Sequence, residues 1–217
     1  MKILTLSHKT ILIYRIIFAG LSWFTIITGA VIYTLTFGSI LGWFNSFIAF
    51  TMQTNLIVTI WFTLAILSYN NPDIFKKYLR PLKGALTLYI TITFIFFAIL
   101  LSPFYHPTGW AAFSNLILHY ITPIAFIVDW VLTETELRYK WNYMLYWMIY
   151  PICYLVFAFI YGTITGVYIY YFLDITKLGI LGYILFILIL ITAGLALGSL
   201  YIAINRRRIK LTEEGLK

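Results

Sequence analysis

The stretch from Asn115 to Val131, NLILHYITPIAFIVDWV, decides the fold class. It is almost as apolar as a segment that crosses a lipid bilayer, yet it contains His119, Pro123 and Asp129. Ionisable side chains are costly inside a bilayer, so those that an apolar segment retains are candidates for function. The stretch therefore predicts a membrane helix that carries a polar site.

The composition of the whole chain leads to the same class. Of 217 residues, 62% are hydrophobic and 10% are charged, which is more apolar surface than a water-soluble domain of this size can bury. A spanning helix needs about 20 apolar residues. The uncharged runs are Ile16–Pro72, Gly84–Val128, Trp141–Leu173 and Leu178–Asn205. The first two are long enough for two spans each, so the sequence predicts an all-α integral membrane protein.

Two turn-rich segments divide the long runs. They are LTFGSILGW (Leu35–Trp43) and SPFYHPTGW (Ser102–Trp110), and each contains Gly or Pro and ends in an interfacial tryptophan. The expected result is one domain over residues 1–217 with six transmembrane helices. Their expected spans are 10–36, 44–69, 84–102, 112–132, 143–163 and 177–204.

The basic residues predict the orientation. With six spans, the termini and the second and fourth loops share one side, and this side holds all of the 15 Lys and Arg residues except Lys177. By the positive-inside rule both termini are cytoplasmic, and we expect a bacterial plasma membrane. The net charge of +8 then reflects topology and a lipid-facing collar, and we expect no nucleic-acid partner. The N-terminal apolar run is interpreted as a retained helix, because it is longer than the core of a signal peptide.

Two polar side chains lie at matching depths. His119 follows Trp110 by nine residues, and Thr51 follows Trp43 by eight. At 1.5 Å per residue, both lie roughly 12–14 Å below the outer interface. Their helices run in the same direction, so the two side chains can meet if the helices are neighbours.

Each of these residues belongs to a polar stripe at helical spacing. One stripe holds Asn115, His119 and Thr122, and the other holds Thr51, Thr54, Asn55 and Thr59. Facing each other, the stripes would line a pocket, and Pro123 would loosen the helix beside it. A structural role stays open for each member. Threonine in a membrane helix commonly bonds to its own backbone, and a buried histidine can be a simple interhelical hydrogen bonder.

The two intramembrane aspartates predict other roles. Asp129 lies about 15 Å beyond His119 along the helix, so we expect a structural ion pair with Arg15. Asp174 has two possible roles. It either caps the last helix, or its carboxylate holds the imidazole of His119 or lines the pocket mouth.

Three segments together resemble a known family, the androgen-induced and androgen-dependent six-helix membrane proteins with their bacterial "Pr-six-Pr" relatives. FNSFIAFT (Phe44–Thr51) ends where the family has its threonine nucleophile. Asn115 and His119, with Asp129 ten residues on, match the family's asparagine, histidine and acid. YYFLD (Tyr170–Asp174) is similar to the family's Tyr-Pro-Phe-Leu-acid sequence.

The resemblance implies a threonine hydrolase that cleaves fatty acid esters of hydroxy fatty acids. Thr51 would be the nucleophile and His119 the general base. Asn55 or Asn115 would stabilise the oxyanion, and Thr122 would line the pocket. The partners would be membrane lipids and a lipid ester. No cofactor and no metal are expected, and the single Cys153 makes neither a disulfide framework nor a cysteine metal site.

Other functional classes are less consistent with the residues. A non-catalytic lipid-binding or scaffold protein is the main alternative. A transporter is less favoured, because the polar groups gather in one layer. A bis-histidine haem site would need two helical histidines, but His8 and His106 lie outside the predicted spans. A retinal protein would need a lysine inside a span, and the predicted spans contain none at depth.

Overall fold

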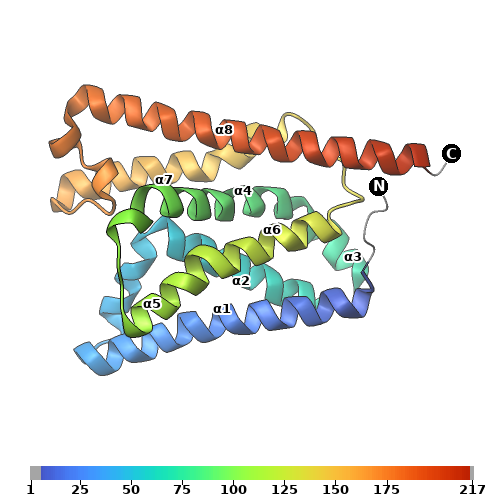
Figure 1. Cartoon of the computed structure of the whole chain (residues 1–217), viewed down its shortest axis with the longest axis horizontal. Helices are drawn as coiled ribbons and strands as arrows, with labels where there is room; N and C mark the ends of the chain where they lie inside the picture. Colours follow the sequence, from blue (N-terminus) through green and yellow to red (C-terminus); the bar gives the residue numbers. More distant parts are fainter. Residues whose placement is uncertain (1–5, 216–217) are drawn as a thin grey trace. The chain divides into compact units, whose positions relative to one another are not determined.

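The computed structural model describes residues 6–215 of the chain, with side chains up to Leu211 (Figure 1). Over these residues the protein is all-helical, with no strand. Six helical segments are long and apolar enough to cross a membrane, which confirms the predicted fold class to that extent. They are His8–Phe37, Phe50–Leu67, Pro72–Phe104, Gly109–Thr133, Tyr143–Thr165 and Ile175–Leu211.

The chain folds as two compact units, residues 1–137 and 138–217. The first unit holds α1 (His8–Phe37), α2 (Phe50–Leu67), α3 (Pro72–Ile74), α4 (Arg80–Phe96), α5 (Gly109–Leu116) and α6 (Thr122–Thr133). The second unit holds α7 (Tyr143–Thr165) and α8 (Ile175–Gly215), which pack on each other. That residues 1–217 form a single domain stays a prediction.

Two of the six segments begin at places that differ from the predicted ones. The second begins at Phe50, because residues Leu41–Ile48 form a separate 3₁₀ helix and Ala49 is extended. The third begins at Pro72, well before the predicted start at residue 84. Lys83 therefore lies inside a helix, and its side chain is 1% exposed. The predicted span of 84–102 left Lys83 outside, and this boundary was wrong: the helix begins before Lys83, and Asp129 neutralises its charge inside the fold.

The helix ends follow from local residue chemistry. The Ser7 hydroxyl accepts a hydrogen bond from the Thr10 amide at 3.1 Å and caps the start of α1. Gly38 and Gly166 close α1 and α7 with φ of 70° and 71°, a conformation that disfavours residues with a Cβ. Gly179, at φ 66° and ψ 169°, breaks the helical path near the start of α8. The predicted break between the first two spans is thus confirmed at Gly38.

Three single turns of π-helix interrupt the helices of the first unit, and each stands directly before an X-Pro pair. A proline has no amide hydrogen, and its ring clashes with the carbonyl four residues earlier. Widening the preceding turn to an i→i+5 pattern moves that carbonyl away. The π-turns are Phe75–Leu79, Phe97–Leu101 and Ile117–Ile121, and the pairs are Arg80-Pro81, Ser102-Pro103 and Thr122-Pro123.

The helices of the first unit pack around an aromatic centre. Helix α4 packs against α2 and α6, and α1 packs against α2 (Figure 1). The Phe126 ring makes edge contacts with Trp61 and Phe62, with centroid distances of 5.1 and 5.2 Å. All three side chains are at most 2% exposed. Aromatic edge contacts of this kind add to the burial of apolar surface.

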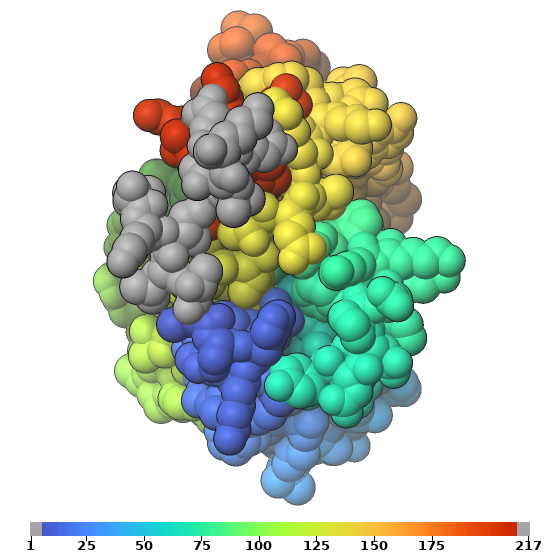
Figure 2. Space-filling model, turned by 90° about the vertical axis from the view of Figure 1, so that its right-hand side faces the viewer, coloured from blue at the N-terminus to red at the C-terminus, as the bar shows by residue number. Residues whose placement is uncertain are grey.

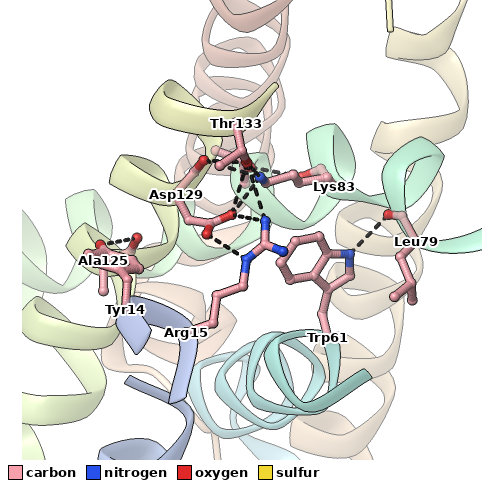
Figure 3. Close-up of polar contacts among 9 residues, drawn as sticks. Tyr14, Arg15, Trp61, Leu79, Lys83, Ala125, Asp129 and Thr133 are labelled. Atoms are coloured by element: carbon pink, nitrogen blue, oxygen red, sulfur yellow. Dashed lines mark hydrogen bonds and ion pairs between the residues drawn. The ribbon is translucent and has the colours of Figure 1, made fainter. Parts of the chain in front are cut away.

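A cluster of charged side chains lies beside this aromatic centre (Figure 3). Arg15 of α1 donates through Nε to Asp129 Oδ2 of α6 at 2.8 Å, so the predicted ion pair is present. The ammonium of Lys83 in α4 lies 2.5 Å from Asp129 Oδ1 and also contacts Thr133. Asp129 is 0% exposed. One carboxylate therefore joins three helices.

The remaining helix of the unit also contributes to the charged cluster. The ring of Trp61 in α2 lies 5.2 Å from the Arg15 guanidinium and 5.0 Å from the Lys83 ammonium, within the range of cation–π attraction. The indole N–H donates to the Leu79 carbonyl at 2.9 Å, which fixes the ring. Glu134, 1% exposed, adds a second negative charge that acts on Lys83. The two cations are thus matched by two carboxylates.

Substitution of Asp129 by Asn should strongly destabilise the fold. Arg15 and Lys83 would keep their charges in a buried site without their shared partner, which typically costs about 3–5 kcal/mol. Equilibrium unfolding in mixed micelles of a neutral detergent and dodecyl sulfate measures the change.

The control is Glu136→Gln, which removes an ion pair with Arg80 whose carboxylate is 60% exposed. It should cost less than about 1 kcal/mol. Equal losses for Asp129→Asn and Glu136→Gln would show that the buried cluster does not hold the helices together.

Candidate functional site

His119 lies in the π-turn that precedes Pro123. Its Nδ1 is 3.2 Å from the Asn115 carbonyl oxygen. A carbonyl oxygen only accepts hydrogen bonds, so Nδ1 carries the proton and donates it to Asn115. Nε2 is then the unprotonated, basic nitrogen. No hydrogen bond within residues 6–215 engages Nε2, so the imidazole presents a general base.

An aromatic contact fixes the imidazole plane. The His119 ring stacks on Phe97 with a centroid distance of 3.7 Å and an interplanar angle of 25°. Phe97 begins the π-turn after α4, so two π-turns meet at this contact. The neighbouring Tyr120 donates its hydroxyl to Ser102 Oγ at 3.0 Å and packs edge-on against Phe97. The histidine is therefore held from its backbone side and from one face.

The side chain of Asn55 joins the two predicted polar helices. Its amide nitrogen donates to the Thr51 carbonyl at 2.9 Å and to the Leu118 carbonyl at 2.8 Å. Leu118 precedes Pro123 by five residues, and in the π register its carbonyl would bond to the amide that proline lacks. Asn55 supplies the missing donor. The side-chain amide of Asn55 thus links the backbone carbonyl of Thr51 to that of Leu118, the residue before His119.

Thr51 is the second residue of α2, and its hydroxyl is uncommitted. Thr59 and Thr63, deeper in the same helix, donate their hydroxyls to the carbonyls of Asn55 and Thr59, four residues earlier. The corresponding carbonyl for Thr51 is that of Phe47, which lies before the helix and accepts from Gln53. No hydrogen bond within the described residues engages the Thr51 hydroxyl. It also makes none to His119 in this structure.

The rest of the two predicted stripes is used for helix packing. Thr54 exchanges a hydrogen bond with Thr93 of α4 at 2.8 Å. Thr122 does the same with Ser22 of α1 at 2.9 Å. The expectation that the stripes face each other is correct for Asn55 and wrong for Thr54 and Thr122. The physical reason is that each stripe is wide enough to touch a third helix.

Two amide oxygens at this site are buried without a hydrogen-bond partner among the described residues. They are Oδ1 of Asn55 and Oδ1 of Asn115. A buried acceptor without a donor costs free energy that a hydrogen-bonding ligand can recover. Both amide hydrogens of Asn55 are engaged by backbone carbonyls, so its predicted oxyanion role requires the release of one of them. The amide nitrogen of Asn115 is engaged by none of the described hydrogen bonds.

Sequence reasoning missed several residues that shape this region. Phe97 and Ser102 were part of an apolar span and a turn, and Lys83 lay outside the predicted span of 84–102. The positions of the prolines were an available signal, because each π-turn ends two residues before a proline. The chemistry of Lys83 was also signalled by Asp129, since a buried carboxylate needs cations around it.

Asp174 lies in the second unit and caps α8, which is one of its two predicted roles. Its Oδ1 accepts from the Thr176 amide at 3.0 Å and from the Thr176 hydroxyl at 2.5 Å. These hydrogen bonds, with the nearby Lys177 ammonium, hold the pKa of Asp174 below its usual range. That Asp174 orients His119 stays a prediction.

The comparisons with known proteins identify no relative. No family model matches the sequence, and neither a curated protein nor a solved structure is significantly similar to it. Among the described residues, no group of three or more His, Cys, Asp or Glu side chains is arranged to hold a metal ion. The function is therefore argued from the site geometry and the sequence motifs alone.

The bridge between the two polar helices can be tested by a double-mutant cycle. Asn55→Ala should lower the free energy of unfolding by about 1–3 kcal/mol, because it leaves the buried Leu118 carbonyl without a donor. Pro123→Ala restores a backbone amide that can bond to the same carbonyl. The double variant should therefore lose less than the sum of the single losses, by at least about 0.5 kcal/mol. Strict additivity would contradict the proposed link between Pro123 and Asn55.

The cap at Asp174 should make the stability of α8 depend on pH. The pKa of the carboxyl is lower in the folded state, so its contribution is complete above the unfolded pKa of about 3.9 and is lost as the pH falls through the folded pKa. Asp174→Asn keeps a capping oxygen and should flatten this acid-side loss. Thermal unfolding between pH 2 and pH 6 measures the difference. Identical pH profiles of the variant and the parent would refute the role of the charge.

Proposed function

We propose that the chain is an integral membrane protein with six spans and both termini in the cytoplasm, in a bacterial plasma membrane. The six long apolar helices and the placement of the basic residues support this arrangement. Large apolar side chains are exposed along the helices, and lipid would cover them. On α8 they include Ile180, Leu181, Ile184, Leu185, Leu188 and Ile189.

We also propose that the site around His119 hydrolyses lipid esters, and that the chain is a relative of the androgen-induced six-helix threonine hydrolases. The observation that carries this proposal is the state of the imidazole. Its Nδ1–H donates to Asn115, so a basic Nε2 is presented in the same region as the uncommitted hydroxyl of Thr51. A threonine hydroxyl needs such a base to become a nucleophile.

The reaction would proceed through two acyl transfers. Nε2 of His119 takes the proton from the Thr51 hydroxyl, and the oxygen attacks the ester carbonyl. The tetrahedral intermediate collapses, the alcohol leaves with the proton from His119, and an acyl-threonine remains. Nε2 then takes a proton from a water that attacks this ester; as the second intermediate collapses, the fatty acid departs and His119 returns the proton to the Thr51 oxygen. The two side chains would come within hydrogen-bond reach in the substrate complex, as catalytic contacts often tighten on binding.

The side chains of Asn55 and Asn115 would make different hydrogen bonds in the reaction. Asn115 has an unengaged amide nitrogen and is the better donor to the oxyanion. The oxygen of Asn55 is an acceptor, so it suits a group that donates, such as the attacking water or the hydroxyl of the departing alcohol. An ester itself has no donor. The site would therefore hold its products and its water more firmly than its substrate.

An apolar cavity supports the choice of a lipid substrate. It has a volume of about 520 Å³ and lies between α1, the 3₁₀ helix and α2, with Ile26, Trp43, Phe47 and Leu56 among its lining residues. Ile26, Trp43 and Leu56 also belong to the cluster that packs around Leu118, next to His119. An acyl chain in this cavity would thus lie close to the reacting groups. A fatty acid ester of a hydroxy fatty acid fits this arrangement.

A non-catalytic lipid-binding role is the second candidate. It is favoured by the absence of a hydrogen bond between Thr51 and His119 within the described residues. In that case the polar groups would only anchor a lipid head beside the apolar cavity. Binding without turnover would distinguish the two roles.

Removal of either catalytic group should abolish hydrolysis. For Thr51→Ala and His119→Ala, we expect kcat/KM for a fatty acid ester of a hydroxy fatty acid to fall by about 10³-fold or more. Thr51→Ser keeps a hydroxyl and should retain part of the activity. Purified protein in detergent is assayed by chromatography of the released acid. In parallel, a fluorophosphonate probe should label Thr51 in the parent protein and not in His119→Ala.

Two matched controls separate chemistry from folding. Thr59→Val removes a hydroxyl from the same helix that bonds only to its own backbone, and His106→Ala removes a histidine outside the site. Both should keep near-parental turnover. If Thr51→Ala and His119→Ala also hydrolyse the ester at the parental rate, the assignment of both residues is wrong. Ester binding by a parent protein that shows no turnover and no label would select the lipid-binding role.

A further inference from the structure

A second cavity lies at the other end of the first unit, away from His119. It has a volume of about 850 Å³ and lies between the start of α1, the end of α2, the α3 segment and the end of α6. Arg15, one of its lining residues, pairs with Asp129, which is about 15 Å from His119 along the helix. On the face shown in Figure 2, the blue start of α1 adjoins the blue-green segment that includes α3. This basic cavity is distinct from the proposed hydrolytic site.

Among the described residues, the polar wall of the basic cavity carries more cations than carboxylates. Arg15, Lys76 and Arg80 line it together with the imidazole of His8, against the carboxylate of Glu136. Arg15 is held by Asp129, and Arg80 by Glu136. No ion pair within the described residues engages Lys76.

The electrostatics of Glu136 report the same excess. The hydrogen bond from Arg80 lowers the pKa of its carboxyl, and the charges of Lys76 and His8 act in the same direction. Glu136 is the only carboxylate among the lining residues, so an anion placed in the cavity would meet mostly positive charge. Lysine ammonium and arginine guanidinium groups are the usual side-chain ligands of phosphate.

The cavity also has a large apolar lining. It includes Ile11, Leu12, Ala65, Phe75 and Leu132, together with the uncharged polar residues Ser68, Tyr69, Thr133 and Thr135. A small inorganic anion would leave this apolar surface uncovered. A ligand with a charged head and an apolar body would cover both parts.

We propose that this cavity binds the phosphate headgroup of an anionic phospholipid, with Lys76 as its principal ligand and the glycerol and upper acyl chain against the apolar wall. Free phosphate offers the same head chemistry and lacks the apolar body. The assignment rests on the proposed membrane location, and it does not rest on the hydrolase activity. Clusters of basic residues at the cytoplasmic ends of spans are suited to such lipids.

The test compares neighbouring lysines on one helical turn. Lys76 lines the cavity, whereas Lys77 does not. The ammonium of Lys77 lies 4.9 Å from the centroid of the Tyr78 ring. The full chain in neutral detergent micelles is titrated with phosphatidylglycerol, phosphatidylcholine and inorganic phosphate, and binding is followed by the shift of the thermal midpoint and by native mass spectrometry. We expect phosphatidylglycerol to bind more tightly than the other two. Lys76→Gln should weaken its binding about tenfold, and Lys77→Gln should leave it unchanged.

Three results would overturn the proposal. Equal effects of Lys76→Gln and Lys77→Gln would show general charge attraction without a site. Equal affinity for phosphatidylcholine would show that the anionic charge of the lipid is not recognised. Inorganic phosphate binding as tightly as phosphatidylglycerol would assign the cavity to a free phosphate compound.

Ester hydrolysis measured on the same samples separates this proposal from the proposed function. Lys76→Gln should retain parental turnover, because Lys76 lies outside the hydrolytic site. Loss of lipid binding with turnover intact supports two independent sites. A parent protein that binds phosphatidylglycerol but hydrolyses no ester would leave the basic cavity supported and the hydrolase role refuted.

Discussion

The ion pairs of Asp129 are the constraint on which the first unit depends. Apolar helices in lipid gain little from contact with each other through the hydrophobic effect, because lipid is as apolar as their side chains. In the proposed bilayer location, a carboxylate shared by Arg15 and Lys83 would have no alternative partner in lipid, so separation of α1, α4 and α6 would expose charges to hydrocarbon. The indole of Trp61 brings α2 to the same point. Side chains of these four helices therefore meet at one polar cluster.

The prolines shape the site at the other end of the same helices. Each of the three π-turns accommodates the ring that follows it, and each leaves backbone groups outside the regular helical pattern. Because Pro123 has no amide hydrogen, the carbonyl of Leu118 is available to Asn55. A hydrogen bond that is missing within one helix is thus replaced by a hydrogen bond between two helices. His119 lies in this π-turn and stacks on Phe97. The change of helical pattern before Pro123 and the contact between helices thus occur at the same place.

The sequence predicts the coarse fold well because the relevant signals are long and local. Six apolar runs, their turn residues and the ion pair of Arg15 with Asp129 follow from charge and spacing. The start of the third segment and the burial of Lys83 could not be predicted from the sequence. A lysine at the edge of an apolar run gives the same sequence pattern whether solvent surrounds it or a carboxylate pairs with it. For the candidate site, the matching depth of Thr51 and His119 was predicted from their spacing to Trp43 and Trp110, and the hydrogen bond from Asn55 to the Leu118 carbonyl joins their two helices. The outward bonds of Thr54 and Thr122 depend on which third helix is adjacent, and spacing along one helix carries no such information.

The two polar regions of the first unit differ in how many of their polar groups have a hydrogen-bond or ion-pair partner. Around Asp129, the charges of Arg15 and Lys83 are paired with the carboxylate, and the hydroxyl of Thr133 donates to a backbone carbonyl. Around His119, two amide oxygens and one imidazole nitrogen face no donor within the described residues. A buried acceptor without a donor costs free energy. A ligand that carries a hydroxyl hydrogen could donate to these acceptors and recover that free energy. Water and an alcohol meet that requirement, and both are participants in the hydrolysis of an ester. The paired charges around Asp129 link the helices, while the unpaired acceptors around His119 can accept hydrogen bonds from a ligand.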